Sequence, residues 1–359
     1  KVQATLWIYC QIMCRILGEA VGVAKGDYET LSRFMVACVL IDKEDTHATA
    51  NADERDKAYR ILDLTSLTVE EFEQFVPAFE TAFLAHMDEW TLEGKPRTGR
   101  RYSQYANCPL PSPQDRLLFI LSYLKVAPIQ AAHGVLFGMG QPKANQWIHT
   151  LLPVLAQALA ETGDLPARTR AELQARVAQV TQEASTLFVH DGTERPIVRP
   201  QDPDEQRSCY SGKKKRHTVK NVLLVQAFLV LFLSDTYEGS AHDKPIADAT
   251  PYPLPPDSEL LDDLGFLGYD LAGVQHTRPI KKPKGGQLTD EQKAHNRQVA
   301  QRRVVIEHIL SSIKRCRILK DTIRLWKDDV RDLVMAICCG LHNFRLRLNP
   351  WPERALKSG

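Results

Sequence analysis

The sequence predicts a chain of mixed α+β or α/β class, with a helical first half and a second half built on a mixed, five-stranded sheet flanked by helices. Apolar residues recur at helical spacing up to about residue 180, and from Ser185 the pattern changes to β-branched or apolar runs separated by turn residues. At 359 residues the chain is long enough for two or three domains. We expect four regions: a helical N-terminal region at 1–100, a helix-turn-helix domain at 110–155, a helical linker at 156–184 and a sheet domain at 185–348.

The N-terminal region reads as helical and acidic. Thr68 followed by Glu71 is typical of a helix start, because the two residues can satisfy each other's backbone N–H groups. This pattern predicts a helix through EEFEQFVPAFETAFLAHM. The stretch EGKPRTGRRYSQ, residues 93–104, is polar and basic, and we interpret it as a linker.

Three short helices are expected next, at 114–124, 129–137 and 141–152. Gly138, Met139 and Gly140 would form the glycine turn that a helix-turn-helix needs between its last two helices. The third helix would then be a recognition helix. Its first turns carry polar side chains suited to base edges and phosphates: Gln141, Lys143, Asn145 and Gln146. Other bundles of short helices also contain glycine turns, so an ordinary bundle is the alternative.

The sheet domain reads as three strands, a helix, two strands and a long helix. We expect the first three strands at 186–200, 217–230 and 230–240, followed by a short helix near 243–249. The last two strands are expected at about 260–266 and 274–280, and the long helix at about 290–317. Such an order favours a mixed sheet with helices on its faces.

Three carboxylates stand out in this pattern: Asp191 at the end of the first strand, Asp263 at the end of the fourth, and Glu307 within the long helix. A helix that crosses one edge of a sheet can bring such distant acids together. Clustered carboxylates repel one another unless cations neutralise them, and oxygen ligands favour Mg²⁺ or Mn²⁺. Two such ions about 4 Å apart stabilise the attacking and leaving oxygens of a phosphoryl transfer. The pattern therefore indicates cleavage or joining of nucleic-acid strands.

The long helix presents a charged face. Arg303, Glu307 and Lys314 are spaced i, i+4 and i+11, which places them within roughly 40° of one another around the helix. The alternative interpretation is an ordinary amphipathic helix in which Arg303 and Glu307 form an ion pair.

Positive charge is concentrated near the C-terminus, where residues 270–359 carry 19 Lys and Arg against 9 Asp and Glu. Such an excess is expected of a surface that meets a polyanion. Two basic runs are candidate contacts to DNA phosphates, with solvated loops as the alternative: Lys213, Lys214, Lys215 and Arg216, and Lys281 with Lys282. The eight cysteines follow no zinc-site spacing and indicate a reducing compartment, and we expect no membrane span.

Six passages of the second half occur in a recognisable order: HDGTERPIVRP, YSGKKKRHTVKN, DTYEGSAHDKPIAD, DDLGFLG, RPIKKPKG and RRVVIEHILSSIKR. On these motifs, residues 112–345 resemble the DDE transposases of bacterial insertion sequences, in particular the insertion-sequence-five family, which is related to the Harbinger transposases of eukaryotes. The resemblance implies an RNase H-like catalytic domain whose three acids bind metal.

The resemblance assigns those acids by motif. It implies that Asp191 is the Asp of a D-G-T motif, that Asp263 is the first residue of D-x-G-[FY], and that Glu307 belongs to a pattern of Arg, three residues, Glu, six residues and Lys. Related families carry a Tyr three residues before that Arg, where this chain has Ala300. Whatever contact the Tyr makes there is absent or supplied by another residue.

Asp243, in the EGSAHDK passage, is the alternative second acid. We expect Asp263 instead, because it would end the fourth strand, where an RNase H-like sheet places its second acid. Asp243 would open the following helix, where capping and the helix dipole explain an acid.

The sequence therefore predicts a bacterial insertion-sequence transposase that binds terminal inverted repeats and catalyses strand cleavage and strand transfer with two Mg²⁺ (or Mn²⁺) ions. A homodimer or higher synaptic complex on the nucleoid, in the bacterial cytoplasm, is the expected setting. Two alternatives differ in testable ways. A domesticated, non-catalytic DNA-binding protein would not nick DNA, and a general RNase H-like nuclease would cut without needing terminal repeats.

Overall fold

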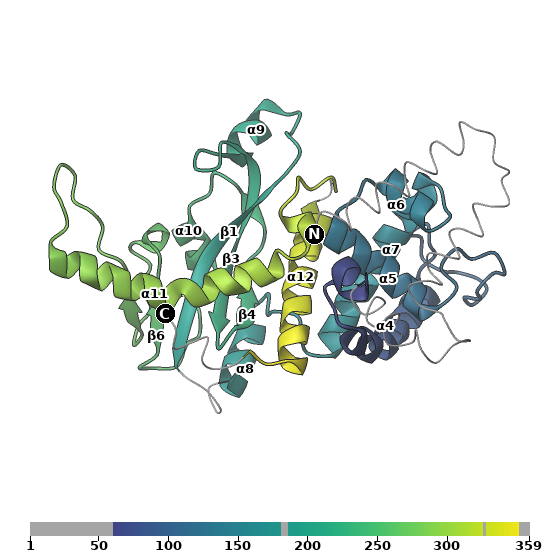
Figure 1. Cartoon of the computed structure of the whole chain (residues 1–359), viewed down its shortest axis with the longest axis horizontal. Coiled ribbons are helices and arrows are strands. Elements are labelled where there is room, and N and C mark those ends of the chain that lie inside the picture. The colour runs from purple at the N-terminus through teal and green to yellow at the C-terminus, as the bar shows by residue number, and fades with distance from the viewer. Residues whose placement is uncertain (1–59, 181–185, 326–327, 352–359) are drawn as a thin grey trace, which may run out of the picture. The chain divides into compact units, whose positions relative to one another are not determined.

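The computed structural model describes residues 60–180, 186–325 and 328–351 (Figure 1). The chain divides into two compact units, Lys1–Val154 and Leu155–Gly359. Within the described residues, no helix combines the length and the apolar character needed to cross a membrane.

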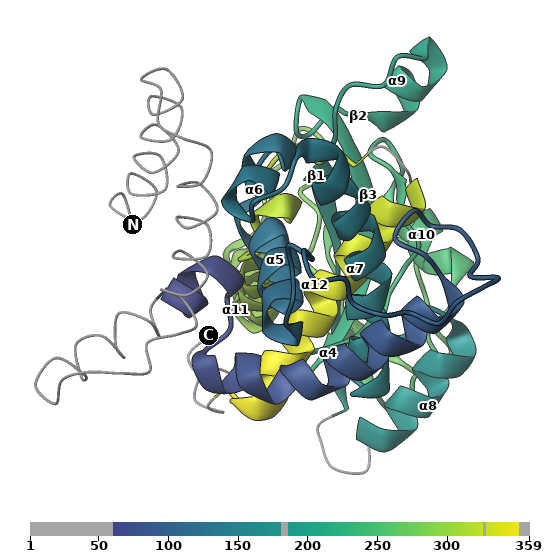
Figure 2. The same cartoon turned by 90° about the vertical axis from the view of Figure 1, so that its right-hand side faces the viewer.

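The described part of the first unit, residues 60–154, is helical, as predicted; residues 1–59 of the predicted N-terminal region lie outside the described residues. It contains α4 (Val69–Glu89), α5 (Pro113–Val126), α6 (Gln130–Leu136) and most of α7 (Gln141–Glu161). Thr68 and Glu71 form the expected capping box at the start of α4. Phenylalanines of α4 and α5 and Trp147 of α7 are fully buried. The short α6 lies against α5 (Figure 2). Its His133 Nε2 is 3.0 Å from the carbonyl oxygen of Phe119 in α5.

The helices of the predicted helix-turn-helix are present with small differences in length. The last of them, α7, continues nine residues beyond the predicted end at Leu152, because the apolar spacing persists through Leu155 and Leu159, which are buried. Gly138 adopts a positive φ of 70° in the turn before α7, a conformation that glycine reaches without a steric penalty.

The second unit is built on a mixed sheet. Its strands in the described residues are β1 (Leu187–Pro196), β2 (Tyr210–Ser211), β3 (Arg216–Gln226), β4 (Leu229–Leu233), β5 (Tyr237–Glu238), β6 (Glu259–Leu261) and β7 (Gln275–Thr277). The order is β2-β3-β1-β6-β7, with β4 and β5 also paired to β3. β1 is antiparallel to β3 and parallel to β6.

The prediction of five strands was low by two. The third predicted strand is divided into β4 and β5, and β2 is a two-residue strand formed only by pairing with β3. Strands of two residues carry no periodicity of their own, so the sequence pattern did not reveal them.

Helices cover the sheet. They are α8 (Arg170–Val180), α9 (Pro203–Cys209), α10 (Asp243–Ala249), α11 (Asp290–Ile313) and α12 (Asp328–Leu348), with short 3₁₀ turns η1 (Leu264–Phe266) and η2 (Arg317–Leu319). The predicted linker at 156–184 contains α8, whose Leu173 and Val177 are buried in the core of this unit. The long α11 packs along β1 (Figure 1).

Candidate active site

Asp191 is the fifth residue of the ten-residue β1, so the prediction that it ends its strand is wrong. β1 runs on to Pro196 because it stays paired with β3 as far as Thr218. What ends near Asp191 is the pairing with β6, whose last register pair is Val189 with Leu261. Asp191 therefore follows that last pair by two residues.

Asp263 also follows the last β1–β6 pair by two residues, because β6 ends at Leu261. It stands just before η1, in extended backbone, and so lies beyond the strand and not at its end. In a parallel register, equivalent residues stand side by side and face the same way. Continued two residues beyond its last pair, this register places Asp263 next to Asp191, although 71 residues lie between them in the sequence.

Arg303 joins the two carboxylates. One terminal nitrogen of its guanidinium lies 3.2 Å from Asp263 Oδ1 and the other 3.7 Å from Asp191 Oδ1. Arg303 comes from α11, which therefore covers the face of the sheet that carries Asp191. The alternative ion pair with Glu307 is not formed among the described residues, since the guanidinium turns to the aspartates instead.

The positive charge of Arg303 does not fully compensate the two aspartates. The pKa of Asp191 is raised to about 6, chiefly by burial; Arg303 opposes the rise, and the charges of Asp263 and Asp243 add to it. Keeping these carboxylates charged and close together costs free energy, which a bound divalent cation would offset. The donors are oxygen atoms alone, which suits Mg²⁺ or Mn²⁺. Within the described residues, however, no group of three or more His, Cys, Asp and Glu side chains lies close enough to hold a metal ion.

Glu307 is the acid that the structure does not bring to the pair. It lies one turn after Arg303 on α11, with an exposed side chain. Its carboxylate makes no hydrogen bond or ion pair within the part of the chain that the structure describes. Lys314 stands at the C-cap of α11, where burial and then the charge of Lys214 lower its pKa while Asp191 raises it. Lys314 thus lies within electrostatic reach of Asp191.

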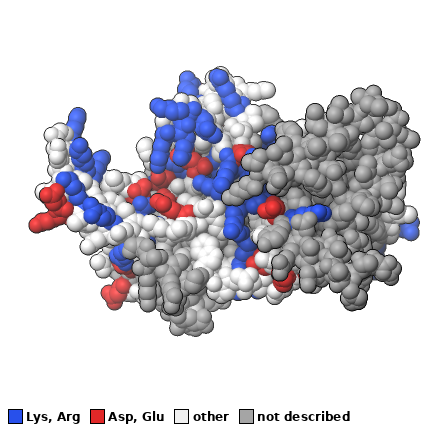
Figure 3. All heavy atoms as spheres, in the orientation of Figure 1, with Lys and Arg blue, Asp and Glu red and all other residues white. Residues whose placement is uncertain are grey.

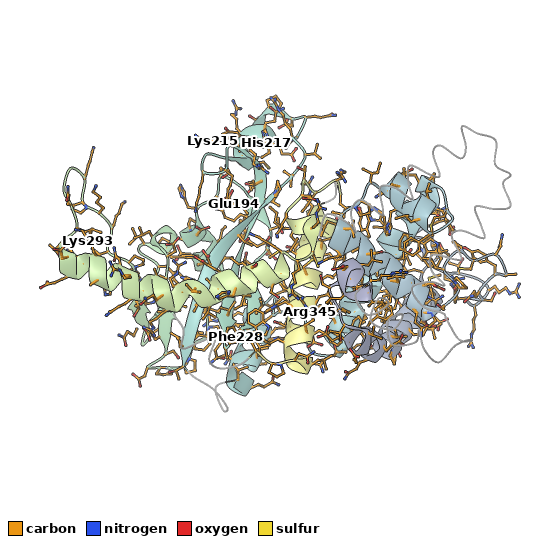
Figure 4. The ribbon with its side chains drawn as sticks, in the orientation of Figure 1. Glu194, Lys215, His217, Phe228, Lys293 and Arg345 are labelled. Atoms are coloured by element: carbon orange, nitrogen blue, oxygen red, sulfur yellow. The ribbon has the colours of Figure 1, made fainter. Side chains whose placement is uncertain are left out.

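Asp243 is the first residue of α10, as predicted, but it does not cap the helix. Its carboxylate Oδ1 lies 3.2 Å from Lys220 Nζ, and the Nζ is 3.9 Å from Glu194 Oε1 on β1 (Glu194 is labelled in Figure 4). Lys220 also donates to the Ala241 carbonyl oxygen at 2.8 Å. Asp243 is therefore fixed by an ion pair.

Two motif glycines make room for the Asp243 carboxylate. A Cβ on Gly192 would lie 2.4 Å from Asp243 Oδ1, and a Cβ on Gly265 would lie 2.6 Å from Oδ2. Neighbouring residues of a strand face opposite sides, so Asp243 approaches β1 from the face opposite to that of Asp191. The glycines of the D-G-T and D-x-G-F motifs thus share one neighbour.

A buried polar network that the sequence did not predict lies next to the acids. Asp262 Oδ1 is 2.8 Å from His190 Nε2, and its Oδ2 is 2.8 Å from His276 Nδ1 and 2.7 Å from the Arg278 guanidinium. The side chains of His190 and Asp262 are fully buried. His190 stacks on Phe266 of η1 with ring centroids 3.7 Å apart. The only sequence signal was that His190 and Asp262 each precede a predicted metal ligand.

Charges within this network are assigned by its hydrogen bonds. His276 Nε2 accepts from the Leu271 N–H at 3.1 Å, so its Nδ1 carries the proton that goes to Asp262. Burial lowers the pKa of His190, which keeps that ring neutral as well. Burial tends to raise the pKa of Asp262, but the contacts from the two histidines outweigh it and lower the pKa. Arg278 then supplies the balancing positive charge.

The predicted recognition-helix residues are partly engaged within the first unit. Gln141 Nε2 and Asn145 Nδ2 both donate to Gln130 Oε1 at 3.0 Å. Lys143 Nζ lies 5.8 Å from the centroid of the Tyr105 ring, and Gln146 is half-buried. Exposed donors on the first turns of α7 thus remain few, with Lys143 the one positive charge among the four.

The two basic runs are exposed. Lys213, Lys214 and Lys215 lie in the turn between β2 and β3, and Arg216 is the first residue of β3; Lys215 and the neighbouring His217 are labelled in Figure 4. Lys and Arg side chains gather above a group of acids on this face of the second unit (Figure 3). Lys281 and Lys282 lie in the irregular segment before α11.

Two family models match the chain. Residues 190–343 match the family described as DDE superfamily endonuclease, and residues 108–161 match the helix-turn-helix of DDE superfamily endonuclease. A probable transposase for the insertion sequence element IS702 of Microchaete diplosiphon is 26% identical over 236 residues, which cover 66% of this chain and 81% of that protein. No solved structure matches significantly.

Proposed function

We propose, from the premise that this chain belongs to the DDE transposases of insertion sequences, that it binds the terminal inverted repeats of its element and cuts DNA at the element ends. The helix-turn-helix at 110–155 would bind the repeats, and the domain at 185–348 would cut and rejoin the strands. The observation that supports this most is the position of Asp191 beside Asp263, bridged by Arg303.

Asp191, Asp263 and Glu307 are the proposed metal ligands. Two bound Mg²⁺ or Mn²⁺ ions would supply charge stabilisation for the oxygens that attack and leave the phosphorus. Asp263 is preferred to Asp243 as the second acid because it shares a face with Asp191, whereas Asp243 is held on the opposite face by Lys220. Glu307 lies one turn from Arg303 on the helix that covers this face.

The remaining charged groups would position the DNA. Arg303 contacts both aspartates and Lys314 lies within electrostatic reach of Asp191, so these two would contact the phosphate to be cut. Lys213 to Arg216, Lys281 and Lys282 would neutralise phosphates further along the strand. Catalysis would then consist of positioning and charge neutralisation, without a covalent intermediate on the protein. We infer that the chain acts as a homodimer or higher synaptic complex on the bacterial nucleoid, since two element ends must be cut together.

The decisive test is nicking of a labelled duplex that carries the terminal repeat, with and without Mg²⁺. Wild-type protein is expected to cut at the repeat end only with the ion, and Glu307→Gln to abolish cutting while binding the duplex as tightly as the wild type. Undiminished cutting by Glu307→Gln would overturn the assignment. Equal cutting of an unrelated duplex would indicate a general nuclease instead.

A further inference from the structure

The segment Trp90–Tyr105 is an ordered loop, and it includes residues 93–104, which the sequence led us to interpret as a linker. Trp90 and Pro96 form an isolated β-bridge, and the Thr91 N–H donates to the Lys95 carbonyl oxygen at 2.9 Å. The Arg97 N–H donates back to the Glu89 carbonyl oxygen, at the end of α4, at 2.7 Å. The loop therefore folds back on α4.

Two side chains anchor this loop to the core of the first unit. Arg97 donates from Nε to the Met87 carbonyl oxygen at 2.6 Å and from a terminal nitrogen to that of Trp90 at 3.1 Å, so it satisfies carbonyls at the end of α4. Tyr102 meets Phe83 edge to face at 5.6 Å, and Phe83 stacks on Trp147 of α7 at 6.3 Å. Through these rings the loop is fixed relative to the predicted recognition helix.

A groove of about 640 Å³ lies between this loop and the start of α7. Its lining includes one carboxylate, Glu93, and four cationic side chains: Arg97, Arg100, Arg101 and Lys143. Arg100 and Arg101 are exposed, and their guanidinium groups make no hydrogen bond or ion pair within the described residues. Lys143 is shared by the groove and the recognition helix. Among the residues that the structure describes, none of these four cations forms an ion pair with an acid, and Arg97 alone is engaged by backbone carbonyl oxygens.

We infer that Arg100 and Arg101 extend the DNA-binding surface of the helix-turn-helix by contacting backbone phosphates beside the segment that α7 would read. Guanidinium groups bind phosphate through paired N–H donors, and such contacts fix the position of a recognition helix without reading sequence. An anchored loop supplies them at a lower entropic cost than a free linker would. This inference rests on the proposed function, since it adds a contact to the same DNA.

The test uses the full chain and fluorescence anisotropy of two labelled duplexes of equal length, one with the terminal repeat and one unrelated. Each phosphate neutralised by the protein changes the slope of log Kd against log salt by about 0.9, so Arg100→Gln/Arg101→Gln should lower the slope by roughly 1.8 on both duplexes. At 0.15 M salt, affinity should fall about tenfold or more. The preference for the repeat over the unrelated duplex should stay unchanged.

Lys95→Gln/Arg170→Gln is the matched control, because it removes two exposed cations outside the groove. It should leave the slope and the affinity close to wild type. An unchanged slope in the Arg100/Arg101 variant, or an equal loss in the control, would overturn this inference alone. Absence of any wild-type preference for the repeat would instead count against the proposed function, while the slopes on the unrelated duplex would still decide the role of the loop.

Discussion

Asp262 and Asp263 are neighbours in one motif, yet they lie in opposite surroundings. The side chain of Asp262 is 0% exposed and contacts two imidazoles and a guanidinium within 2.8 Å. That of Asp263 is 39% exposed, and within the described residues its one charged partner is Arg303, at 3.2 Å. The charge of Asp262 is neutralised by contacts within the fold, whereas the more exposed carboxylate of Asp263 remains accessible to a ligand. A count of acids in a motif therefore says little about which one binds metal.

On β1, too, neighbouring residues have different surroundings, and this alternation determines the arrangement of the site. His190 faces the buried network, Asp191 faces Arg303, and Gly192 faces Asp243. The segment after β6 repeats this order with Asp262, Asp263 and then Gly265. In each segment, one residue (His190 or Asp262) belongs to the buried polar network, and the next (Asp191 or Asp263) belongs to the pair of aspartates beside Arg303. The network fixes the two segments in register and so sets the separation of Asp191 and Asp263.

The largest difference should appear when the two neighbours are changed in turn. Asp262→Asn leaves the half-buried Arg278 and two imidazoles without the buried carboxylate that they contact, and it should lower the free energy of unfolding by about 3 kcal/mol. Asp263→Asn removes a surface acid and should change stability by less than about 1 kcal/mol. Urea unfolding of both variants measures this contrast.

In activity we expect the opposite order, with Asp263→Asn the more severely affected of the two variants. Asp263→Asn should abolish Mg²⁺-dependent strand cleavage while retaining the wild-type unfolding curve. Asp262→Asn, assayed at a temperature where it remains folded, should retain cleavage at a reduced rate. If Asp263→Asn cut DNA normally and Asp243→Asn did not, the proposed assignment of the second acid would be reversed.

The glycines give a second contrast, of intermediate size. In Gly192→Ala the new methyl group must displace the Asp243 carboxylate, and such overpacking should cost about 1–3 kcal/mol. Gly212→Ala is the matched control, because nothing lies within 4 Å of a Cβ at that position. Combining Gly192→Ala with Asp243→Ala should restore part of the loss in a double-mutant cycle. Simple additivity of the two changes would show that the glycine and Asp243 are not coupled.

Local patterns predicted much of this fold but little of its fine geometry. The helix starting after Thr68 and the long α11 follow from capping and apolar spacing, which act within a few residues. The end of β1 could not be predicted locally, because it depends on the pairing of Pro196 with Thr218 of β3, 22 residues further along the chain. The loop at 93–104 was interpreted as a linker because its composition is polar, whereas its order comes from Arg97 and Tyr102 contacting residues outside it.

The candidate site shows the same division. Motif spacing identified Asp191 and Asp263, and the structure brings them together. The partners of Asp262 lie 72, 14 and 16 residues away in the sequence, at His190, His276 and Arg278, so no local pattern connects them. Glu307 stands on the expected helix, but its place in the site stays a prediction.

The smallest expected effect concerns pH and contrasts Asp191 with the buried Asp262. The pKa of Asp191 is raised to about 6, chiefly by burial, so its protonated form is favoured in the folded state. Stability from this group is fully present below the unfolded pKa of about 4 and is lost as pH rises through 6. The side chain of Asp191→Asn carries no charge. At pH 7.5 the free energy of unfolding of this variant should therefore exceed that of the wild type by about 1–2 kcal/mol after solvent screening is allowed for. At pH 4 in the same metal-free buffer, the two proteins should be equally stable.

Glu73→Gln, at an exposed position, is the control for loss of one surface charge. A constant difference in stability between Asp191→Asn and the wild type from pH 4 to 7.5 would show that the titration of Asp191 is not coupled to folding. Asp262 should behave in the opposite sense, because its pKa is lowered: the stability that it contributes is present above pH 4 and is lost only as the pH falls further.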